Sequence, residues 1–457
     1  MHFTIHLRQV DDQGQLIRDE VIHSLEKGID QLAEIGLGLE EGKSVLAALQ
    51  RPIVEAQIDG YLRRHGDCPH CRRRLWRKGS YSVAFRTLFG TVTLTSPRLY
   101  RCVCRPGKAK TFSPLAALLT ENTSPELLYL ESKWASLVSF GVTVDLLKDV
   151  LPIDRANVST VRRHLNRVAA RAEADLGRDP ACPSQGSSRF GAAEPVVVGI
   201  DGGYVRKGSD KKRRFEVVVG KSMVRGRRDR YFGLVQTYDD QPKRRIANVL
   251  REQGLSMTEE VTFLTDGADN VRKLAIDMSP CAQHLLDWFH LSMRMQNLSQ
   301  YTDGLKHHDP KDAADRVERI KWCLWHGKTD EALRRIRVLA DDLTKIDTAY
   351  ARMKRFVRKA GELHTYVTNN QRSIPDYEER RRQGKRIATS FVESTVNTLV
   401  GKRFAKNQQM QWSKKGAHHM LQIRSRTLDG SLQTMFRNWF PGLPTNETKN
   451  AEPSAVA

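Results

Sequence analysis

Apolar runs separated by polar turns fill the middle of the chain and predict a buried sheet. Residues 195–200 form a continuous apolar run that leads into Asp201-Gly202-Gly203, and the segment 261–265 leads into Asp266-Gly267 in the same way. Between and after these runs the pattern predicts strands at 215–220, 231–237 and 282–286 and a helix over 243–252. Three strands, a helix and two further strands are the order of a ribonuclease-H-like fold.

Helical patterns precede this sheet, over residues 125–177. Ser124 followed by a proline and an acid is typical of a helix N-terminus. Two short apolar-periodic segments follow, at 127–140 and 144–151. The residues from Asn157 then open a basic helix, and its cations include Arg162, Arg163 and Arg167. A basic helix after two short ones predicts a helix-turn-helix whose arginines face DNA, although an ordinary solvated helix face fits the same pattern.

Two closely spaced cysteine pairs lie before the helices. Cys68 and Cys71 are separated by two residues, and Cys102 and Cys104 by one. A hairpin is predicted between the pairs, with strands at 83–88 and 91–95 around Phe89-Gly90. Two thiolate knuckles joined in this way indicate a structural Zn²⁺ site of the zinc-ribbon kind. Four unrelated buried thiols would give the same sequence, and His65 or His70 could replace one thiolate.

The net charge is the most informative of the bulk properties. The 457 residues carry 75 Lys and Arg against 53 Asp and Glu, for a formal net charge of +22. An excess of this size favours a polyanionic partner, and we expect double-stranded DNA. The basic residues are spread along the chain, which argues against a membrane-surface helix. No apolar stretch approaches a membrane span and no secretory signal is visible, so we expect a cytoplasmic, nucleoid-associated protein whose cysteines are not disulfide-bonded.

Carboxylates at the ends of the predicted strands are the candidate catalytic residues. An Asp after a strand is commonly a turn former, but two of them, each followed by Gly, suit the binding of a hard divalent cation. In-line phosphodiester displacement uses two such ions, roughly 3.5–4 Å apart, and needs a third carboxylate. Glu393, with Asn397 one helical turn later, is the best candidate, whereas Glu378 and Glu379 lie in a strongly charged run. A helix-N-terminal acid without catalytic function would look the same as Glu393.

The ordered motifs of residues 195–430 resemble those of DDE transposases from bacterial insertion sequences, specifically the ISKra group, with more distant similarity to the Mutator superfamily. The motifs that carry the resemblance are Val198–Gly203, Leu264–Gly267, Asp287–His290, Phe391–Thr395, Val400–Phe404 and Gln411–Ala417. The resemblance implies that Asp201, Asp266 and Glu393 bind two catalytic Mg²⁺ (or Mn²⁺) ions, with Asp201 bridging both. It identifies Asp287 and His290 as an auxiliary motif, and we expect Lys402, Arg403 and Trp412 to contact DNA.

The resulting organisation is multidomain α/β. We expect an N-terminal region of unknown role at 1–60, a zinc-ribbon-like domain at 61–112, a helix-turn-helix-like domain at 120–177, a linker at 178–194, the first part of the ribonuclease-H-like catalytic domain at 195–290, an all-helical insertion at 291–385, the second part with the Glu393 helix at 386–440, and a disordered tail at 441–457.

The sequence therefore predicts a transposase that cuts DNA at terminal inverted repeats, joins the freed ends to target DNA, and oligomerises when two ends are paired. Two alternatives share its features. A structure-specific nuclease of the same fold would keep the three carboxylates and never join strands. A domesticated DNA-binding regulator would keep the basic domains around an inactive acidic site.

Overall fold

The computed structural model describes residues 1–104, 110–153, 155–178, 196–208, 214–254, 260–276, 282–305, 310–345, 350–388, 394–404 and 411–443. It is mixed α/β with several small sheets, which confirms the predicted class. The chain divides into two compact units, one of residues 1–168 and 432–457 and one of residues 169–431. The expected linker at 178–194 and tail at 441–457 lie mostly outside the described residues. No helix of the described part is long and apolar enough to cross a membrane.

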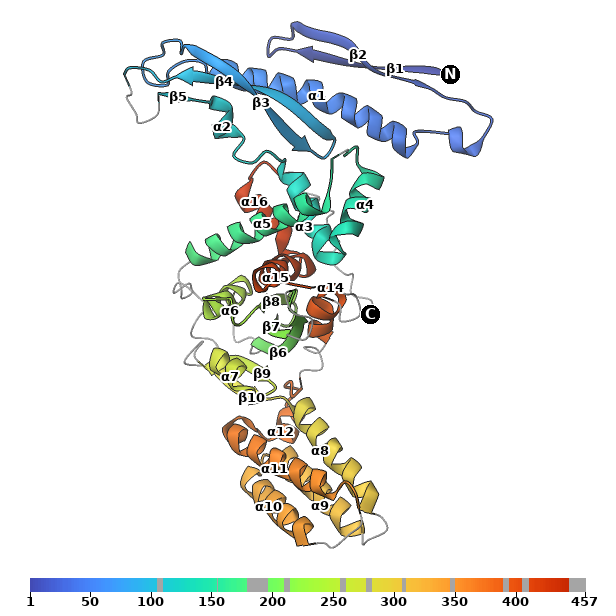
Figure 1. The fold of residues 1–457 in the computed structure, drawn as a ribbon, viewed down its shortest axis with the longest axis vertical. Coiled ribbons are helices and arrows are strands. Elements are labelled where there is room, and N and C mark those ends of the chain that lie inside the picture. The colour runs from blue at the N-terminus through green and yellow to red at the C-terminus, as the bar shows by residue number, and fades with distance from the viewer. Residues whose placement is uncertain are drawn as a thin grey trace. The chain divides into compact units, whose positions relative to one another are not determined.

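The first unit begins with an antiparallel hairpin and a long helix (Figure 1). Strand β1 (His2–Val10) pairs with β2 (Leu16–Glu26), and helix α1 (Leu39–Arg64) follows. Lys27 at the end of the hairpin forms an ion pair with Glu41 in the first turn of α1, at 2.7 Å. Residues 1–60, for which the sequence predicted no role, thus form a hairpin and a helix.

The predicted hairpin between the cysteine pairs is confirmed. Strand β3 (Arg77–Thr87) pairs antiparallel with β4 (Gly90–Tyr100), and the short strand β5 (Thr111–Phe112) adds to β4. Gly90, in the turn, has a φ of +110°, which an L side chain adopts only under strain. Helix α2 (Pro114–Leu118) follows, and Leu115 packs with Val92 of β4 and Val54 of α1 in one apolar cluster.

Three consecutive helices follow, where the sequence predicted them. They are α3 (Pro125–Leu137), α4 (Phe140–Val150) and α5 (Val158–Arg178). The expected cap is present, since the Ser124 hydroxyl accepts a hydrogen bond from the N–H of Leu127. The first helix ends three residues earlier than its apolar run, because Ser139 caps α4 and Phe140 belongs to that helix. The last helix of this unit is α16 (Ser431–Trp439), and its Phe436 contacts Tyr129 of α3.

A five-stranded sheet forms the centre of the second unit. Its strands are β6 (Val196–Arg206), β7 (Arg214–Met223), β8 (Arg230–Leu234), β9 (Val261–Thr265) and β10 (Ala282–Leu286). Their order in space is β10-β9-β6-β7-β8. Strands β6, β9 and β10 are parallel, whereas β7 runs antiparallel to both of its neighbours. Helix α6 (Pro242–Glu252) lies between β8 and β9 in the chain, as predicted, and a helix that was not predicted, α7 (Asp269–Ile276), lies between β9 and β10.

Apolar side chains of the sheet and its helices form one core. Ile200, Phe232 and Phe263 are buried in it together with Ile246 of α6 and Val271 of α7 (Asp269–Ile276). Helix α15 (Lys414–Leu428) packs against β8, where its Gln422 donates a hydrogen bond to the Gly233 carbonyl at 2.8 Å.

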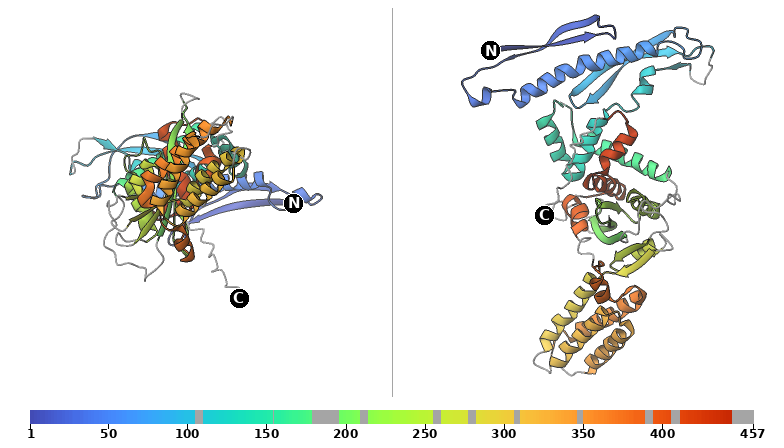
Figure 2. Two further views of the ribbon diagram at one scale, coloured as in Figure 1. Left: turned by 90° about the horizontal axis from the view of Figure 1, so that it is seen from below. Right: turned by 180° about the vertical axis from the view of Figure 1, so that it is seen from behind.

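The expected all-helical insertion is also present, and Figure 2 shows its helices lying side by side. Its helices are α8 (Trp288–Thr302), α9 (Pro310–Trp325), α10 (Thr329–Lys345), α11 (Met353–Asn370) and α12 (Tyr377–Arg382). They enclose a core of their own that includes Leu291, Leu339 and Phe356. The N–H of Trp288 donates to the carbonyl of Ile387 at 3.0 Å, so the two ends of the insertion meet.

Candidate functional site

Asp201 and Asp266 lie next to each other on neighbouring parallel strands. Ile200 of β6 pairs with Thr265 of β9, and each aspartate is the next residue along the chain. Both side chains are partly buried. Strand β9 ends at Thr265, as expected, but β6 does not end before Asp201 as the sequence suggested. It continues to Arg206 because β7 remains paired with it beyond the end of β9.

Backbone N–H groups orient both carboxylates. Asp201 Oδ1 accepts a hydrogen bond from the N–H of Gly202 at 2.7 Å, and Asp266 Oδ1 accepts one from the N–H of Ala268 at 2.9 Å. Two oriented oxygen ligands from adjacent strands are the kind of donor set that Mg²⁺ takes, with water and phosphate oxygens completing its shell. Glu393, the third predicted carboxylate, lies outside the described residues, which resume at Ser394.

Asp287 and His290 form a hydrogen-bonded pair beside these aspartates. Asp287 follows β10, is fully buried, and caps α8 by accepting a hydrogen bond from the N–H of Phe289. Its other oxygen lies 2.8 Å from Nδ1 of His290, one helical turn later. This hydrogen bond raises the pKa of His290, and the negative charges of Asp287, Asp201 and Asp266 raise it further. The structure thus brings the auxiliary motif to the electrostatic neighbourhood of both aspartates.

A chain of hydrogen bonds through the side chains of Thr265, His284 and Ser373 supports the turn that follows Asp266. The N–H of Gly267 donates to the Thr265 hydroxyl at 3.1 Å, and that hydroxyl lies 2.8 Å from Nε2 of His284. Nδ1 of His284 lies 2.8 Å from the hydroxyl of Ser373. Burial lowers the pKa of His284 to about 4, so the ring is neutral at pH 7 and can accept from Thr265 while donating to Ser373.

Residues of the helical insertion also contact the turn that follows Asp266. Tyr366 of α11 donates its hydroxyl to the backbone carbonyl of Asp266 at 2.6 Å, and the guanidinium of Arg294 stacks 3.9 Å from the centre of the Tyr366 ring. Gly267 has a φ of +81°, and a Cβ there would lie 2.6 Å from Oδ1 of Asn370. The backbone at Asp266 is therefore held by residues about 100 positions later in the chain.

None of these supporting residues was identified from the sequence. His284 falls in a short apolar run, where it reads as a strand residue, and Tyr366 occupies an ordinary helical position. Only the fold brings them to Asp266. The one local signal is the Gly after each aspartate, and Gly267 does take a backbone conformation that favours glycine.

The described segment that follows Glu393 packs against β6. Val396 and Val400 lie within 4 Å of the position that a Cβ on Gly203 would take, two residues beyond Asp201. This segment includes the π-helical turn η4 (Asn397–Gly401) and helix α14 (Lys402–Phe404).

The three DNA contacts expected in this region differ in exposure. Lys402 is exposed, whereas Arg403 and Trp412 are 2% and 8% exposed, with the Arg403 guanidinium 5.1 Å from the Trp412 ring centre. Burial and the nearby Arg424 lower the pKa of Arg403 to about 10. The N–H of Trp412 donates to the Arg206 carbonyl at 3.1 Å. In this conformation Trp412 is bonded to the end of β6 and Arg403 is buried against its ring, and the contact of both residues with DNA stays a prediction.

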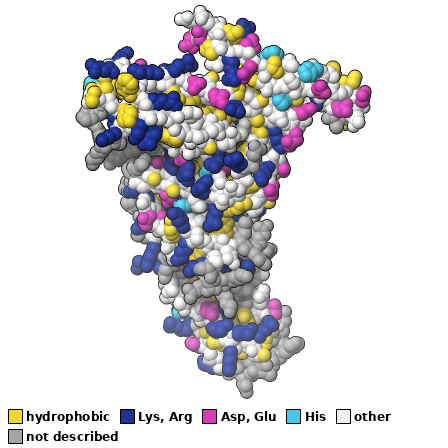
Figure 3. Space-filling view, turned by 45° about the horizontal axis from the view of Figure 1, so that its top comes forward, with side chains coloured by type: hydrophobic (Ala, Val, Ile, Leu, Met, Phe, Trp, Pro, Cys, Tyr) yellow, Lys and Arg dark blue, Asp and Glu magenta, His cyan; other side chains and the backbone are white. Residues whose placement is uncertain are grey.

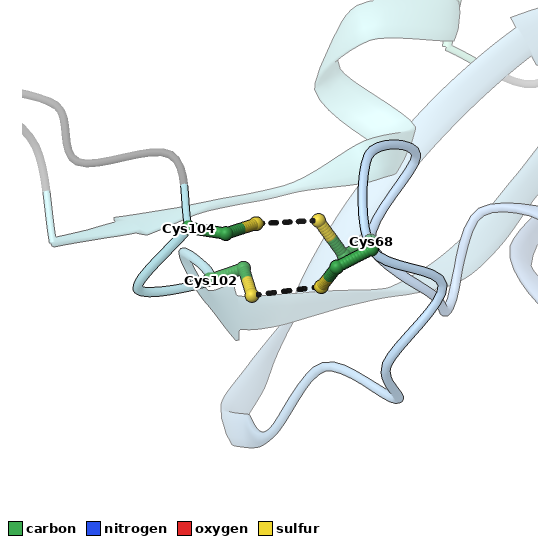
Figure 4. Close-up of side chains that lie close together, drawn as sticks. Cys68, Cys102 and Cys104 are labelled. Carbon is green, nitrogen blue, oxygen red and sulfur yellow. Dashed lines mark hydrogen bonds between the residues drawn. The ribbon is translucent and has the colours of Figure 1, made fainter.

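The four predicted cysteine ligands come together at one end of the β3–β4 hairpin. The Sγ atoms of Cys68 and Cys104 are 3.5 Å apart, those of Cys71 and Cys102 are 3.4 Å apart, and all four lie within 4.8 Å of one another. Figure 4 shows Cys68, Cys102 and Cys104 pointing into the same small volume. A tetrahedral Zn²⁺ with Zn–S bonds of about 2.3 Å fits sulfurs at this spacing. The set contains neither His65, whose Nδ1 bonds to the Tyr61 carbonyl, nor His70.

The backbone around Cys68 prepares the site for a cation. The N–H groups of Cys71 and His70 lower the pKa of Cys68 to about 6, which favours the thiolate that metals require. The neighbouring sulfurs, Cys102 first, raise the pKa of Cys104 to about 12. Thiolates at this spacing repel one another, so a cation among the four sulfurs would stabilise their charged form. The four cysteines can therefore hold a metal ion.

Helix α5 presents a basic face. Arg162 and Arg163 are exposed, and Arg167 is 46% exposed at its side chain and pairs with Glu121. The opposite face of the helix is buried, and His164 there bonds to the buried Glu131 of α3. The three arginines that the sequence singled out thus lie on the outer side of a helix that is fixed to α3.

A second group of possible metal ligands already surrounds a cation. Oxygen and nitrogen atoms of Glu173, Asp239 and His418 lie close enough to hold a metal ion. The buried guanidinium of Arg245 lies among them, 2.8 Å from Asp239, 2.8 and 2.9 Å from Glu173, and 3.3 Å from His418. No pattern in the sequence indicates this network, which acts here as a buried ion pair.

Neither a protein-family model nor a curated protein matches the chain.

Proposed function

We propose that the chain is a DDE-type DNA transposase resembling the ISKra group, which cuts transposon ends and joins them to target DNA. The observation that carries the proposal is the pairing of Ile200 with Thr265, because it sets Asp201 and Asp266 side by side on two parallel strands. Paired carboxylates at this edge of a sheet are a ligand set for divalent cations.

The sheet supports a ribonuclease-H-like catalytic domain. Numbered in chain order, its strands lie in space as 5-4-1-2-3, and only the second strand runs against its neighbours. We propose that this is the ribonuclease-H-like arrangement, in which strands 1 and 4 carry the first two acids. Asp201 is on strand 1, and Asp266 directly follows strand 4.

Under this proposal, the carboxylates, the backbone N–H groups and His290 have separate roles. Asp201, Asp266 and Glu393 would hold two Mg²⁺ ions, which supply an activated nucleophile and stabilise the leaving oxygen. Gly202 and Ala268 hold the aspartate oxygens in place through their N–H groups. His290, whose pKa is raised by Asp287, would bear positive charge near the scissile phosphate.

The remaining parts would bind DNA. We propose that Cys68, Cys71, Cys102 and Cys104 hold a structural Zn²⁺ that fixes the hairpin, and that Arg162 and Arg163 of α5 contact the terminal repeats. The net charge of +22 suits contact with two DNA ends in an oligomer.

The test is a cleavage and joining assay on DNA that carries the gene's own flanking sequences. The wild type is compared with Asp201→Asn in Mg²⁺ and in its absence. Asp240→Asn is the matched control, because Asp240 is an exposed carboxylate of the same unit. We expect metal-dependent nicks at the repeat ends and joined products from the wild type and the control, and DNA binding without nicks from Asp201→Asn.

The two alternatives give different products. Nicks without joined strands in any condition would indicate a nuclease. Binding without nicks by the wild type in both Mg²⁺ and Mn²⁺ would indicate a regulator and refute the enzymatic proposal.

A further inference from the structure

A tryptophan next to the cysteine cluster is almost fully exposed. Trp76 is 82% exposed in the segment between Cys71 and β3, while its neighbour Leu75 is buried. A ring of this size normally contributes its large apolar area to a core or an interface. Since the fold does not use that area, its position needs another explanation.

Tyr100 lies across the strand pair from Trp76. The N–H of Tyr100 donates to the Trp76 carbonyl at 2.8 Å, directly beyond the pair of Arg77 with Leu99. Because side chains alternate along a strand and Leu99 faces the core, the Trp76–Tyr100 pair faces away from it. Tyr100 is 42% exposed. Two exposed aromatic side chains therefore project from neighbouring strand positions on the outer surface of the hairpin.

The cysteine cluster makes this surface rigid. Leu75 and Leu99, the neighbours of the two aromatic residues, pack with Cys68 and Cys102 in one buried cluster. A metal ion bound by the cysteines would fix both strands on which the rings are mounted. Rings held in this way lose little conformational entropy when they bind a flat ligand.

Exposed cations lie close to the two rings in the sequence. Arg72, Arg73 and Lys78 are exposed, and within the part of the chain that the structure describes none of them forms an ion pair. Arg98, two residues before Tyr100, is exposed as well. Figure 3 shows Lys and Arg side chains gathered with hydrophobic ones over the end of the first unit that carries β4 and β5. Such cations are complementary to a row of phosphates.

We propose that Trp76 and Tyr100 form a stacking platform for unpaired bases of single-stranded DNA, with the flanking arginines on its phosphates. In a duplex each base face is covered by the next base pair, so an exposed ring can stack only where bases are unpaired. Aromatic side chains interleaved with cations are the usual construction of single-strand binding surfaces. The site does not depend on the catalytic proposal, because a chain that never cuts DNA would still have it.

The test measures binding by the full-length protein without Mg²⁺ and without a chelator, so that cleavage plays no part and the cysteine site keeps its metal. Fluorescence anisotropy reports the affinity for an oligothymidylate of about 12 nucleotides and for a duplex of the same length. The variants are Trp76→Ala, Trp76→Leu, Trp76→Phe and Arg73→Gln. Trp322→Ala is the control, since Trp322 is 50% exposed in the helical insertion.

We expect Trp76→Ala and Trp76→Leu to weaken single-strand binding by at least about fivefold, the lower end of what one base–aromatic stack contributes. Duplex binding should change by less than about twofold, and Trp76→Phe should retain most of the affinity, because the phenyl ring keeps a π-face. Arg73→Gln should instead reduce the slope of log affinity against log salt by about 0.7, the value for one phosphate contact on a single strand.

Three results would overturn the proposal. Wild-type protein could fail to prefer the single strand to the duplex, Trp76→Leu could bind like the wild type, or Trp76→Leu could weaken both substrates equally. Because Trp76 is outside the core, circular dichroism and metal content should match the wild type in all variants. If Trp76→Ala fails this check, the comparison of Trp76→Leu with Trp76→Phe decides.

Discussion

Replacing Glu173 with Gln should show how strongly the buried ion pair stabilises the second unit. Glu173 contacts both terminal nitrogens of Arg245, at 2.9 and 2.8 Å, and Arg245 also binds Asp239 at 2.8 Å. The Glu173 side chain is 27% exposed, while Arg245 is 4% exposed. The substitution keeps the shape of the side chain and removes one negative charge from beside a buried positive one.

The pKa of Glu173 gives the size of the effect. Burial alone would raise it, but hydrogen bonds from His418 and Arg245 outweigh burial and lower the pKa from 4.5 to about 2. A difference of this size corresponds to ~3 kcal/mol of folding free energy. Because the pKa is lower in the folded state, this contribution is complete above pH 4.5 or so and is lost as the pH falls toward about 2.

The assay is urea unfolding at a series of pH values, followed by fluorescence. At pH 7 we expect Glu173→Gln to unfold with a free energy ~3 kcal/mol below that of the wild type, and we expect the two to converge between about pH 5 and about pH 2. Asp240→Asn, which removes an exposed carboxylate, should follow the wild type throughout. A gap that stays constant down to pH 2 would refute the electrostatic explanation. If a chelator lowered the wild-type stability at pH 7 by a similar amount and left Glu173→Gln unchanged, these residues would be holding a metal ion.

Three further substitutions test the parts of the candidate sites. Cys71→Ser should no longer retain zinc through gel filtration, measured by elemental analysis, because a structural site needs all four ligands; zinc retained at the wild-type level would exclude Cys71 as a ligand. Gly267→Ala should destabilise the second unit by at least about 1 kcal/mol, because Gly267 has a φ of +81°. The control Gly361→Ala should not destabilise it, because no atom lies within 4 Å of the position that a Cβ on Gly361 would take. Equal melting curves for the two variants would contradict this prediction. Tyr366→Phe removes the hydrogen bond to the Asp266 carbonyl, so it should lower the free energy of unfolding by about 1–3 kcal/mol. It should also slow DNA cleavage while leaving DNA affinity unchanged. Unchanged cleavage would show that the turn does not need this hydrogen bond.

Local patterns were sufficient to predict most of the elements. The buried strands were visible as short apolar runs, and the helix starts as caps, since Ser124 does cap α3. The end of β6 was misplaced because the pattern shows where apolar residues stop and not where a neighbouring strand still pairs. Arg214 pairs with Arg206, so β6 continues through polar residues.

The candidate site could be predicted only where its residues are local motifs. Asp201 and Asp266 follow strands and are followed by Gly, which the sequence displays directly. The contacts of His284 with Ser373 and of Tyr366 with Asp266 join residues 89 and 100 positions apart, so no window of sequence contains them. Arg403 looked like a DNA contact because it is a cation in a motif, but exposure depends on packing, and the side chain is buried.

The hydrogen bond between Trp288 and Ile387 closes the helical insertion at its base. A segment whose two ends meet can be gained or lost in evolution with little effect on the sheet that carries it, because a short turn can replace it. Here such a replacement would also take away Tyr366 and Asn370 from beside the Asp266 turn. A shortened protein should therefore keep its sheet and yet need new residues to hold the turn at Asp266.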